Sequence, residues 1–155
     1  MSRFRTIIPV NAKKGKPIYL AGILFAASAI RDGPRCVQVL TEMPREENDA
    51  VYRYPCYETV LGHRSVVREC RVSSGHADHG RGETFIVAAM WDQNDPINIG
   101  LRNLYPVDWR GSILVMKAGS NSYVTNMRAG DYFKAKRALR RYVLRRLTMS
   151  DTYQK

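Results

Sequence analysis

TFIVAAMW, residues 84–91, is a short run of almost entirely apolar residues that contains three β-branched positions and ends at a tryptophan. A run of this kind is typical of a strand that is buried on both faces. We therefore expect this segment to lie inside a sheet that is covered on both sides. Its flanks are polar, because a glycine-rich stretch precedes it and Asp92 follows it.

Four further segments carry the alternation or the β-branched residues of strands. They are CVQVLTEM (36–43), SVVRECRVSS (65–74), GSILVMKAG (111–119) and SYVTNM (122–127). The last two are joined by Gly119-Ser120-Asn121, which is typical of a hairpin turn. The sequence thus predicts a mainly antiparallel sheet of about four or five strands in a single α+β domain.

The apolar segment IYLAGILFAASAI (18–30) has two interpretations. Pro17 suits the first turn of a helix, and Asp32-Gly33-Pro34 is a strong stop signal, which together predict a buried helix. Alternatively, Ala27-Ser28-Ala29 matches the small-residue pattern before a signal-peptidase site, so that residues 1–29 would be a cleaved signal peptide. The segment is too short to span a membrane, which takes about 20 residues. We favour the buried helix.

Three other helices are expected. PREENDAVYRYP (44–55) has acidic residues in its first turn and a proline at its end. Asp95 before Pro96 predicts a cap for a short helix through PINIGLRNL (96–104). Asp131 is expected to cap a final helix over about residues 131–148, which closes a domain that spans 17–155.

The positive charge of the chain is concentrated at its two ends. The formal net charge is +11, from 25 Lys and Arg against 14 Asp and Glu. Residues 1–16 form a basic arm with five basic residues and no acid, and residues 129–155 hold eight basic residues against two acidic ones. The segment between these ends has no net charge. A neutral body with basic ends indicates contact with a polyanion.

The predicted C-terminal helix is amphipathic. One broad face is apolar, formed by Tyr132, Ala135, Leu139, Tyr142, Val143 and Leu147. The opposite ridge carries Lys134, Arg137, Arg141 and Arg145, with neighbours about 5–6 Å apart. Such a row suits the phosphates of a nucleic acid, and Lys13, Lys14 and Lys16 of the N-terminal arm are expected to assist. The competing interpretations are a solvated face, interaction with the helix dipole, and contact with an anionic membrane.

The glycine-rich stretch SSGHADHGRGE (73–83) holds two of the three histidines. His76 and His79 would be two ligands of a metal site completed by Cys70 or by Cys56 with His63, or the general base and general acid of a metal-independent ribonuclease. Gly80-Arg81-Gly82 would contact an anion. We favour an exposed hairpin loop that contacts an anionic partner through Arg81.

Tyrosines in VYRYPCYE (51–58) suggest a platform for bases. Tyr52 and Tyr54 would share one face of an extended segment and could stack on bases, although tyrosines that cover the core would give the same pattern. No recognised nucleic-acid-binding motif is present, so we expect contact mainly with the backbone.

The three cysteines have no paired spacing, which favours a reducing, intracellular location in the cytoplasm or nucleus. We expect no cofactor, no metal, no transmembrane segment and no catalytic residues. The sequence thus predicts a small, basic, non-catalytic protein that binds DNA or RNA. Its first alternative is a protein-interaction or self-assembling module, a homo-oligomer included, with an acidic partner. The second is the ribonuclease.

Overall fold

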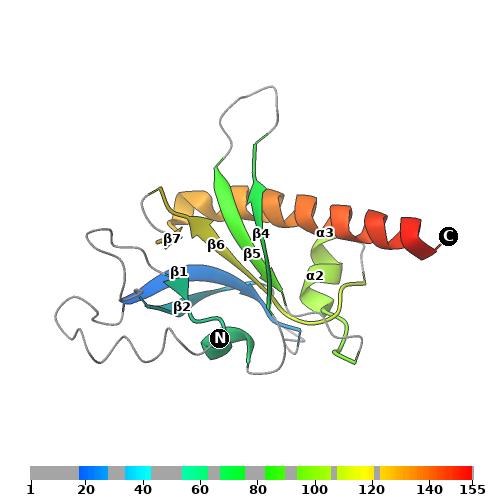
Figure 1. The fold of residues 1–155 in the computed structure, drawn as a ribbon, viewed down its shortest axis with the longest axis horizontal. Coiled ribbons are helices and arrows are strands. Elements are labelled where there is room, and N and C mark those ends of the chain that lie inside the picture. The colour runs from blue at the N-terminus through cyan, green and yellow to red at the C-terminus, as the bar shows by residue number, and fades with distance from the viewer. Residues whose placement is uncertain are drawn as a thin grey trace.

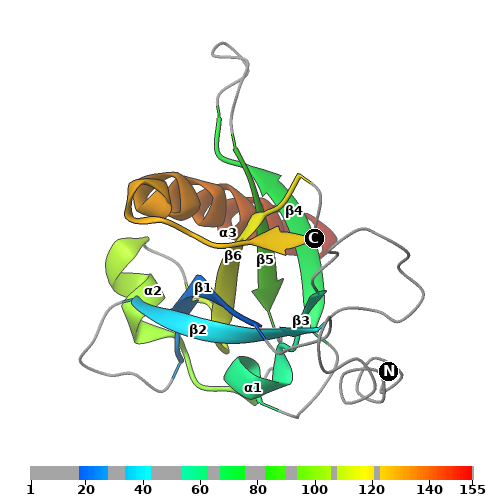
Figure 2. The same cartoon turned by 90° about the vertical axis from the view of Figure 1, so that its left-hand side faces the viewer.

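The structure, a computed structural model, describes residues 18–27, 34–42, 54–62, 67–75, 83–89, 94–105, 108–120 and 123–154, with side chains in the last range described through Arg146. These residues form one curled antiparallel sheet with a long C-terminal helix across one face (Figures 1 and 2). The expected α+β class is confirmed. No helix in this part of the chain is both long and apolar enough to cross a membrane.

Within the described residues the sheet has seven strands, more than the four or five expected, in the order β3-β2-β1-β6-β5-β4, with β7 also paired to β6. The strands are β1 (Ile18–Phe25), β2 (Arg35–Glu42), β3 (Tyr54–Pro55), β4 (Arg68–Ser73), β5 (Thr84–Ala89), β6 (Ile113–Ala118) and β7 (Val124–Thr125). The helices are α1 (Glu58–Leu61), α2 (Ile99–Leu104) and α3 (Tyr132–Gln154), and a 3-10 turn, η4 (Ala129–Asp131), precedes α3. The helix predicted over residues 44–55 lies mostly outside the described residues, and its last two residues form β3 instead.

Strand β5 is buried on both faces, as its sequence predicts. Phe85, Val87 and Ala89 belong to the apolar cluster that also contains the inner side of α3. Ile86 and Ala88 belong to a second cluster on the other face of the sheet. Its neighbour β6 divides its buried residues between the same two clusters. Figure 2 shows how the second face is covered: β1 and β2 cross below β5 and β6, so that the sheet curls over its own core.

The buried helix predicted for residues 18–30 is wrong, because residues 18–25 form strand β1, which pairs with β2 and with β6. All five residues from Ala21 to Phe25 are buried, so the segment shows no polar alternation. A short apolar run of this kind cannot be distinguished from a helix by periodicity alone. Cleavage after Ala29 would remove this strand, so the sheet described here belongs to the uncleaved chain.

Strand β1 passes close to β6 at Gly22. A Cβ atom there would lie 3.1 Å from the carbonyl oxygen of Val115 and 3.2 Å from the side chain of Met116, so a glycine suits this crossing. One residue earlier, the backbone N–H of Ala21 donates to Asn126 Oδ1 over 2.7 Å. The pairing of β1 with β6 covers only Ile23–Phe25, and beyond it β6 pairs with β7 instead. The side chain of Asn126 therefore satisfies the N–H of Ala21, which has no partner on β6.

A buried asparagine joins α2 to the sheet. Asn98 caps α2 by accepting a hydrogen bond from the backbone N–H of Leu101, and its Nδ2 donates to the carbonyl oxygens of Phe25 and Gly111 over 2.8 and 3.0 Å. The cap predicted at Asp95 is therefore wrong. The helix begins three residues later than expected because Ile97 forms an antiparallel bridge with Arg110 and is extended.

The last helix confirms the predicted amphipathic pattern but is longer than predicted, because it extends to Gln154. Its inner face buries Ala135, Ala138, Leu139, Tyr142 and Val143 against the sheet. Tyr105 of the α2 region donates to the carbonyl oxygen of Lys136 over 2.8 Å. The apolar contacts and this hydrogen bond together set the rotation of α3 about its axis, and thus decide which residues face outward.

We expect Asn98→Ala to lower the free energy of unfolding by about 2–4 kcal/mol, because it leaves two buried carbonyl groups and one buried N–H without partners. Urea unfolding followed by circular dichroism measures this loss. Asn103→Ala, at an exposed position of the same helix, is the control and is expected to change stability by less than about 0.5 kcal/mol. Equal stabilities of the two variants would contradict the role given to Asn98.

Candidate nucleic-acid interface

The basic ridge of α3 lies outside the buried face of the helix. Arg137, Arg141 and Arg145 are exposed and Lys134 is half-buried. Beside the ridge, Lys136 and Arg146 lie over the rings of Tyr132 and Tyr142, at 5.3 and 5.8 Å from the ring centroids. Long side chains at the margin of an apolar face place their charges outward in this way.

Two members of the ridge hold the ends of the segment between β4 and β5. Arg141 donates from one guanidinium nitrogen to the carbonyl oxygens of Ser73 and Gly75, over 3.0 and 2.5 Å. Lys134 contacts Glu83 Oε1 at 3.1 Å, at the other end of that segment. The charge of Lys134 is therefore balanced by a carboxylate. The positive charge of Arg141 is not neutralised, because the groups to which it donates are neutral carbonyl groups.

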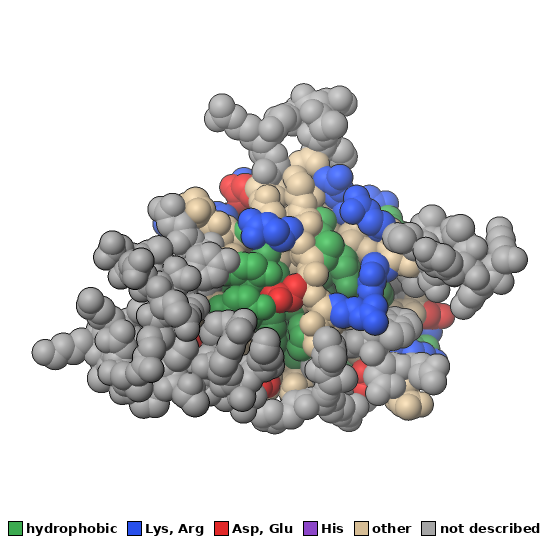
Figure 3. All heavy atoms as spheres, viewed as in Figure 1, with side chains coloured by type: hydrophobic (Ala, Val, Ile, Leu, Met, Phe, Trp, Pro, Cys, Tyr) green, Lys and Arg blue, Asp and Glu red, His purple; other side chains and the backbone are tan. Residues whose placement is uncertain are grey.

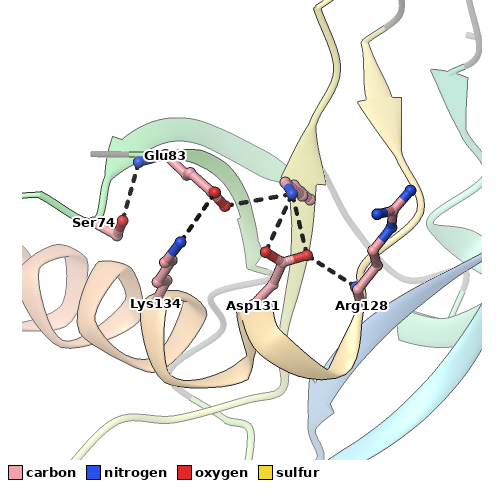
Figure 4. A network of polar contacts seen from close by, with 6 residues as sticks. Ser74, Glu83, Arg128, Asp131 and Lys134 are labelled. Atoms are coloured by element: carbon pink, nitrogen blue, oxygen red, sulfur yellow. Dashed lines mark hydrogen bonds and ion pairs between the residues drawn. The ribbon is translucent and has the colours of Figure 1, made fainter. Parts of the chain in front are cut away.

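A polar network connects the start of α3 with the sheet (Figure 4). Lys117 of β6 contacts Asp131 at 3.1 Å and Glu83 at 3.4 Å, and Glu83 in turn contacts Lys134. Asp131 precedes α3, where a cap was predicted. Its carboxylate accepts from the backbone N–H of Arg128 over 2.9 Å and from Lys117.

The electrostatics of this network favour the ionised carboxylate. Burial alone would raise the pKa of the Asp131 carboxyl group. The hydrogen bond from the Arg128 backbone and the ammonium group of Lys117 outweigh burial, so this pKa lies below its usual value. Burial alone would lower the pKa of the Lys117 ammonium group. The carboxylates of Asp131 and Glu83 outweigh burial, so this pKa lies above its usual value.

A pocket of about 190 Å³ opens between β4 and the later turns of α3. Its lining includes three arginines: Arg68 from β4, and Arg145 and Arg146 from α3. The remaining lining residues are Glu69, Cys70, Val72 and Tyr142. Figure 3 shows basic side chains gathered to the right of centre on the face drawn, on the side where α3 extends past β4 in Figure 1. Arg145 belongs to the predicted ridge, whereas Arg68 was not predicted.

Three tyrosines surround Glu69. Tyr54 and Tyr57 each donate a hydroxyl hydrogen bond to one of its carboxylate oxygens, both over 2.5 Å. The ring of Tyr54 also stacks on Tyr123, with centroids 4.8 Å apart. Burial first, and then the Glu69 carboxylate, raise the pKa of both Tyr57 and Tyr123 above its usual value. Tyr54 thus contacts Glu69 through its hydroxyl group and Tyr123 through its ring. One of the two ring faces that the sequence predicts for stacking on a base is therefore covered by Tyr123.

Sequence reasoning missed Phe133. Its side chain is 73% exposed on α3, one turn before Arg137, and it meets Tyr132 edge-to-face with centroids 5.8 Å apart. The apolar face of a helix is normally buried, so an aromatic residue outside that face is the signal that could have identified it. Leu144, 40% exposed, lies farther along the helix.

Several predicted site residues lie outside the described part of the chain. They are Lys13, Lys14, Lys16, Tyr52, His63, His76, His79 and Arg81. The metal and ribonuclease hypotheses both depend on His76 and His79 and therefore stay predictions. Within the described ranges, no group of three or more His, Cys, Asp or Glu side chains could hold a metal ion.

Comparisons of the chain with protein-family models, with curated proteins and with solved structures found no match.

The lowered pKa of Asp131 predicts an acid-dependent loss of stability. The stabilisation is complete above the unfolded-state pKa of about 4 and is lost as the pH falls through the lower, folded-state value. We expect Asp131→Asn to be less stable than the parent at pH 7 and to lose less further stability on acidification. Urea midpoints measured from pH 7 down to about pH 2 test this expectation.

Asp108→Asn is the control, because Asp108 forms an ion pair with Arg102 in which both side chains are largely exposed. Such pairs contribute little to stability. A parent and an Asp131→Asn variant with the same dependence of urea midpoint on pH would contradict the assignment.

Proposed function

We propose that this protein is a non-catalytic nucleic-acid-binding protein that contacts the phosphate backbone through α3 and the adjoining edge of β4. The observation that supports this most directly is the exposure of Arg137 and Arg145, which make no ion pair within the described residues. Cations without acidic neighbours repel one another, and a face made only for solubility would more often mix both signs.

The spacing of these cations suits an extended polyanion. Arg137 and Arg145 are eight residues apart, which corresponds to about 12 Å along the helix axis. Neighbouring phosphates of one strand are about 7 Å apart, so this distance corresponds to about two phosphate-to-phosphate steps. Arg141 lies between them, and its positive charge is not neutralised because the groups to which it donates are the carbonyl oxygens of Ser73 and Gly75. Three ridge positions thus remain available as phosphate contacts.

Phe133 favours a single strand over a duplex as the ligand. An exposed ring beside a row of cations can stack on an unpaired base while the arginines contact the adjacent backbone. The bases of a duplex are already stacked on one another and offer no free face. Contacts to the backbone and to the faces of bases carry little sequence information, so we expect weak dependence on sequence.

The alternative of a protein-interaction module has one observation in its favour. Phe133 and Leu144 are exposed apolar side chains on the same helix as the cations, and an acidic protein partner could use both. Binding to nucleic acid at low salt distinguishes the two functions, because a protein that binds only an acidic protein partner would not bind nucleic acid under these conditions.

Removal of two outward cations is expected to reduce the salt dependence of binding. For a fluorescent single-stranded oligonucleotide, the slope of log affinity against log salt should shrink by about 1.4 in Arg137→Gln/Arg145→Gln, since each phosphate contact contributes about 0.7. Lys134 and Arg141 are left unchanged because both hold the ends of the β4–β5 segment.

The matched control is Arg35→Gln/Arg128→Gln, which removes the same charge at exposed positions outside α3. Its slope should remain close to that of the parent. An equal reduction in both double variants would show that net charge, and not α3, determines binding. Absence of binding by the parent at low salt would refute the proposal.

We expect Phe133→Ala to weaken binding of single-stranded oligonucleotides about tenfold, within the range of about 1–3 kcal/mol per stacked base, and to leave duplex binding unchanged. Fluorescence anisotropy with a strand and its duplex measures both affinities. Leu144→Ala, which removes an exposed aliphatic side chain from the same helix, is the control. A loss of the same size for strand and duplex would rule out stacking.

A further inference from the structure

The pocket between β4 and α3 differs from the ridge because it is concave and its cations come from two elements. Arg68 extends from β4, and Arg145 and Arg146 extend from α3. Arg146 is held over the ring of Tyr142, whose centroid is 5.8 Å away. Guanidinium groups that converge from separate elements can donate to several oxygens of one anion, and arginine forms paired hydrogen bonds with phosphate.

The acidic residue of the pocket is already engaged. Glu69 lines the pocket, but each of its carboxylate oxygens accepts a hydrogen bond from Tyr54 or Tyr57 on the other side of β4. No ion pair between Glu69 and the three arginines occurs among the described residues. The cations therefore outnumber the single carboxylate and are not neutralised by it.

The volume of the pocket limits what can enter. Pockets for drug-sized ligands measure about 300–1,000 Å³, so a pocket of about 190 Å³ accommodates a group the size of a phosphate but is too small to enclose a whole nucleotide. A phosphodiester inside a strand carries one charge and is flanked by sugars on both sides. A terminal phosphate carries a charge of about −1.5 to −2, presents three acceptor oxygens and can enter a concave site from one side.

We propose that the Arg68–Arg145–Arg146 pocket binds the terminal phosphate of a nucleic-acid strand whose following phosphates lie along the α3 ridge. This inference rests on the proposed function and adds recognition of a strand end to it. Arg145 belongs to both surfaces, and Arg137 lies about 12 Å farther along the helix axis. The strand would therefore leave the pocket toward the N-terminal turns of α3.

The test compares short single-stranded oligonucleotides that carry either a phosphate or a hydroxyl at the 5′ end, with the fluorophore at the 3′ end. A second pair carries the phosphate or hydroxyl at the 3′ end and the fluorophore at the 5′ end. We expect a terminal phosphate at one end to tighten binding about tenfold, the factor of one charge-assisted hydrogen bond. The end that shows the preference identifies the orientation of the strand.

Variants then locate the phosphate. Arg68→Gln should abolish the preference for the phosphorylated end, so that the phosphate-ended and hydroxyl-ended strands bind with equal affinity. Arg137→Gln is the matched control: it should weaken both strands equally and keep the preference. Arg68 is exposed, so its replacement is expected to preserve the fold, which the circular dichroism spectrum verifies.

The outcomes separate the two proposals. If all strands bind equally with a clear salt dependence, the terminal-phosphate inference is wrong and the backbone interface stands. If no strand binds at low salt, both proposals fail. Retention of the preference in Arg68→Gln would also overturn the inference, because the phosphate would then lie elsewhere. Tighter binding of a phosphoserine peptide than of any phosphorylated strand would assign the pocket to a protein ligand and overturn it too.

Discussion

Burial of β5 and β6 on both faces is the constraint on which the rest of this structure depends. From Phe85 to Ala89 and from Ile113 to Met116, every side chain is buried, so neither face of these strands can be left to water. The helix α3 covers one face. The other is covered by the sheet itself, because β1 and β2 turn across it with α1 beneath them (Figure 2). Burial of this apolar area supplies the main driving force for folding.

This arrangement determines what α3 can present to a partner. The helix cannot rotate about its axis without exposing Leu139 and Val143, which are completely buried. The cations at positions 137, 141 and 145 consequently point outward in a fixed order, even though none of them is held by a carboxylate within the described residues. A rigid element with locked inner residues is a better support for a binding surface than a loop. The contacts of Arg141 and Lys134 extend this rigidity to the two ends of the β4–β5 segment.

The parts of the fold that could be predicted are those in which one face of the element is polar, or in which glycine-rich or polar residues bound a short apolar run on both sides. The pattern of α3, the hairpin of β6 and β7 and the burial of β5 all follow from periodicity and turn residues. Strand β1 could not be predicted in this way, because its buried half is apolar on both sides and a helix would give the same letters. The cap at Asn98 was missed for a different reason. Asp95-Pro96 is the stronger local signal, but the bridge between Ile97 and Arg110 keeps that stretch extended, which only the tertiary structure reveals.

In the candidate site, the ridge was predictable from α3 alone. Arg68 was not, since no pattern in the sequence indicates that β4 would lie beside the later turns of this helix.

The position of β4 has a consequence for the behaviour of the protein at high concentration. This strand ends the order of the described sheet, so within the described residues one of its edges has no neighbouring strand and could pair with a strand of another molecule. Natural proteins protect such edges with charged side chains, which make edge-to-edge pairing of identical chains unfavourable. Arg68 and Arg71, both exposed on β4, would lie near their counterparts if two copies paired there, and their mutual repulsion opposes aggregation. Arginine on this edge therefore favours solubility whether or not the strand also takes part in binding.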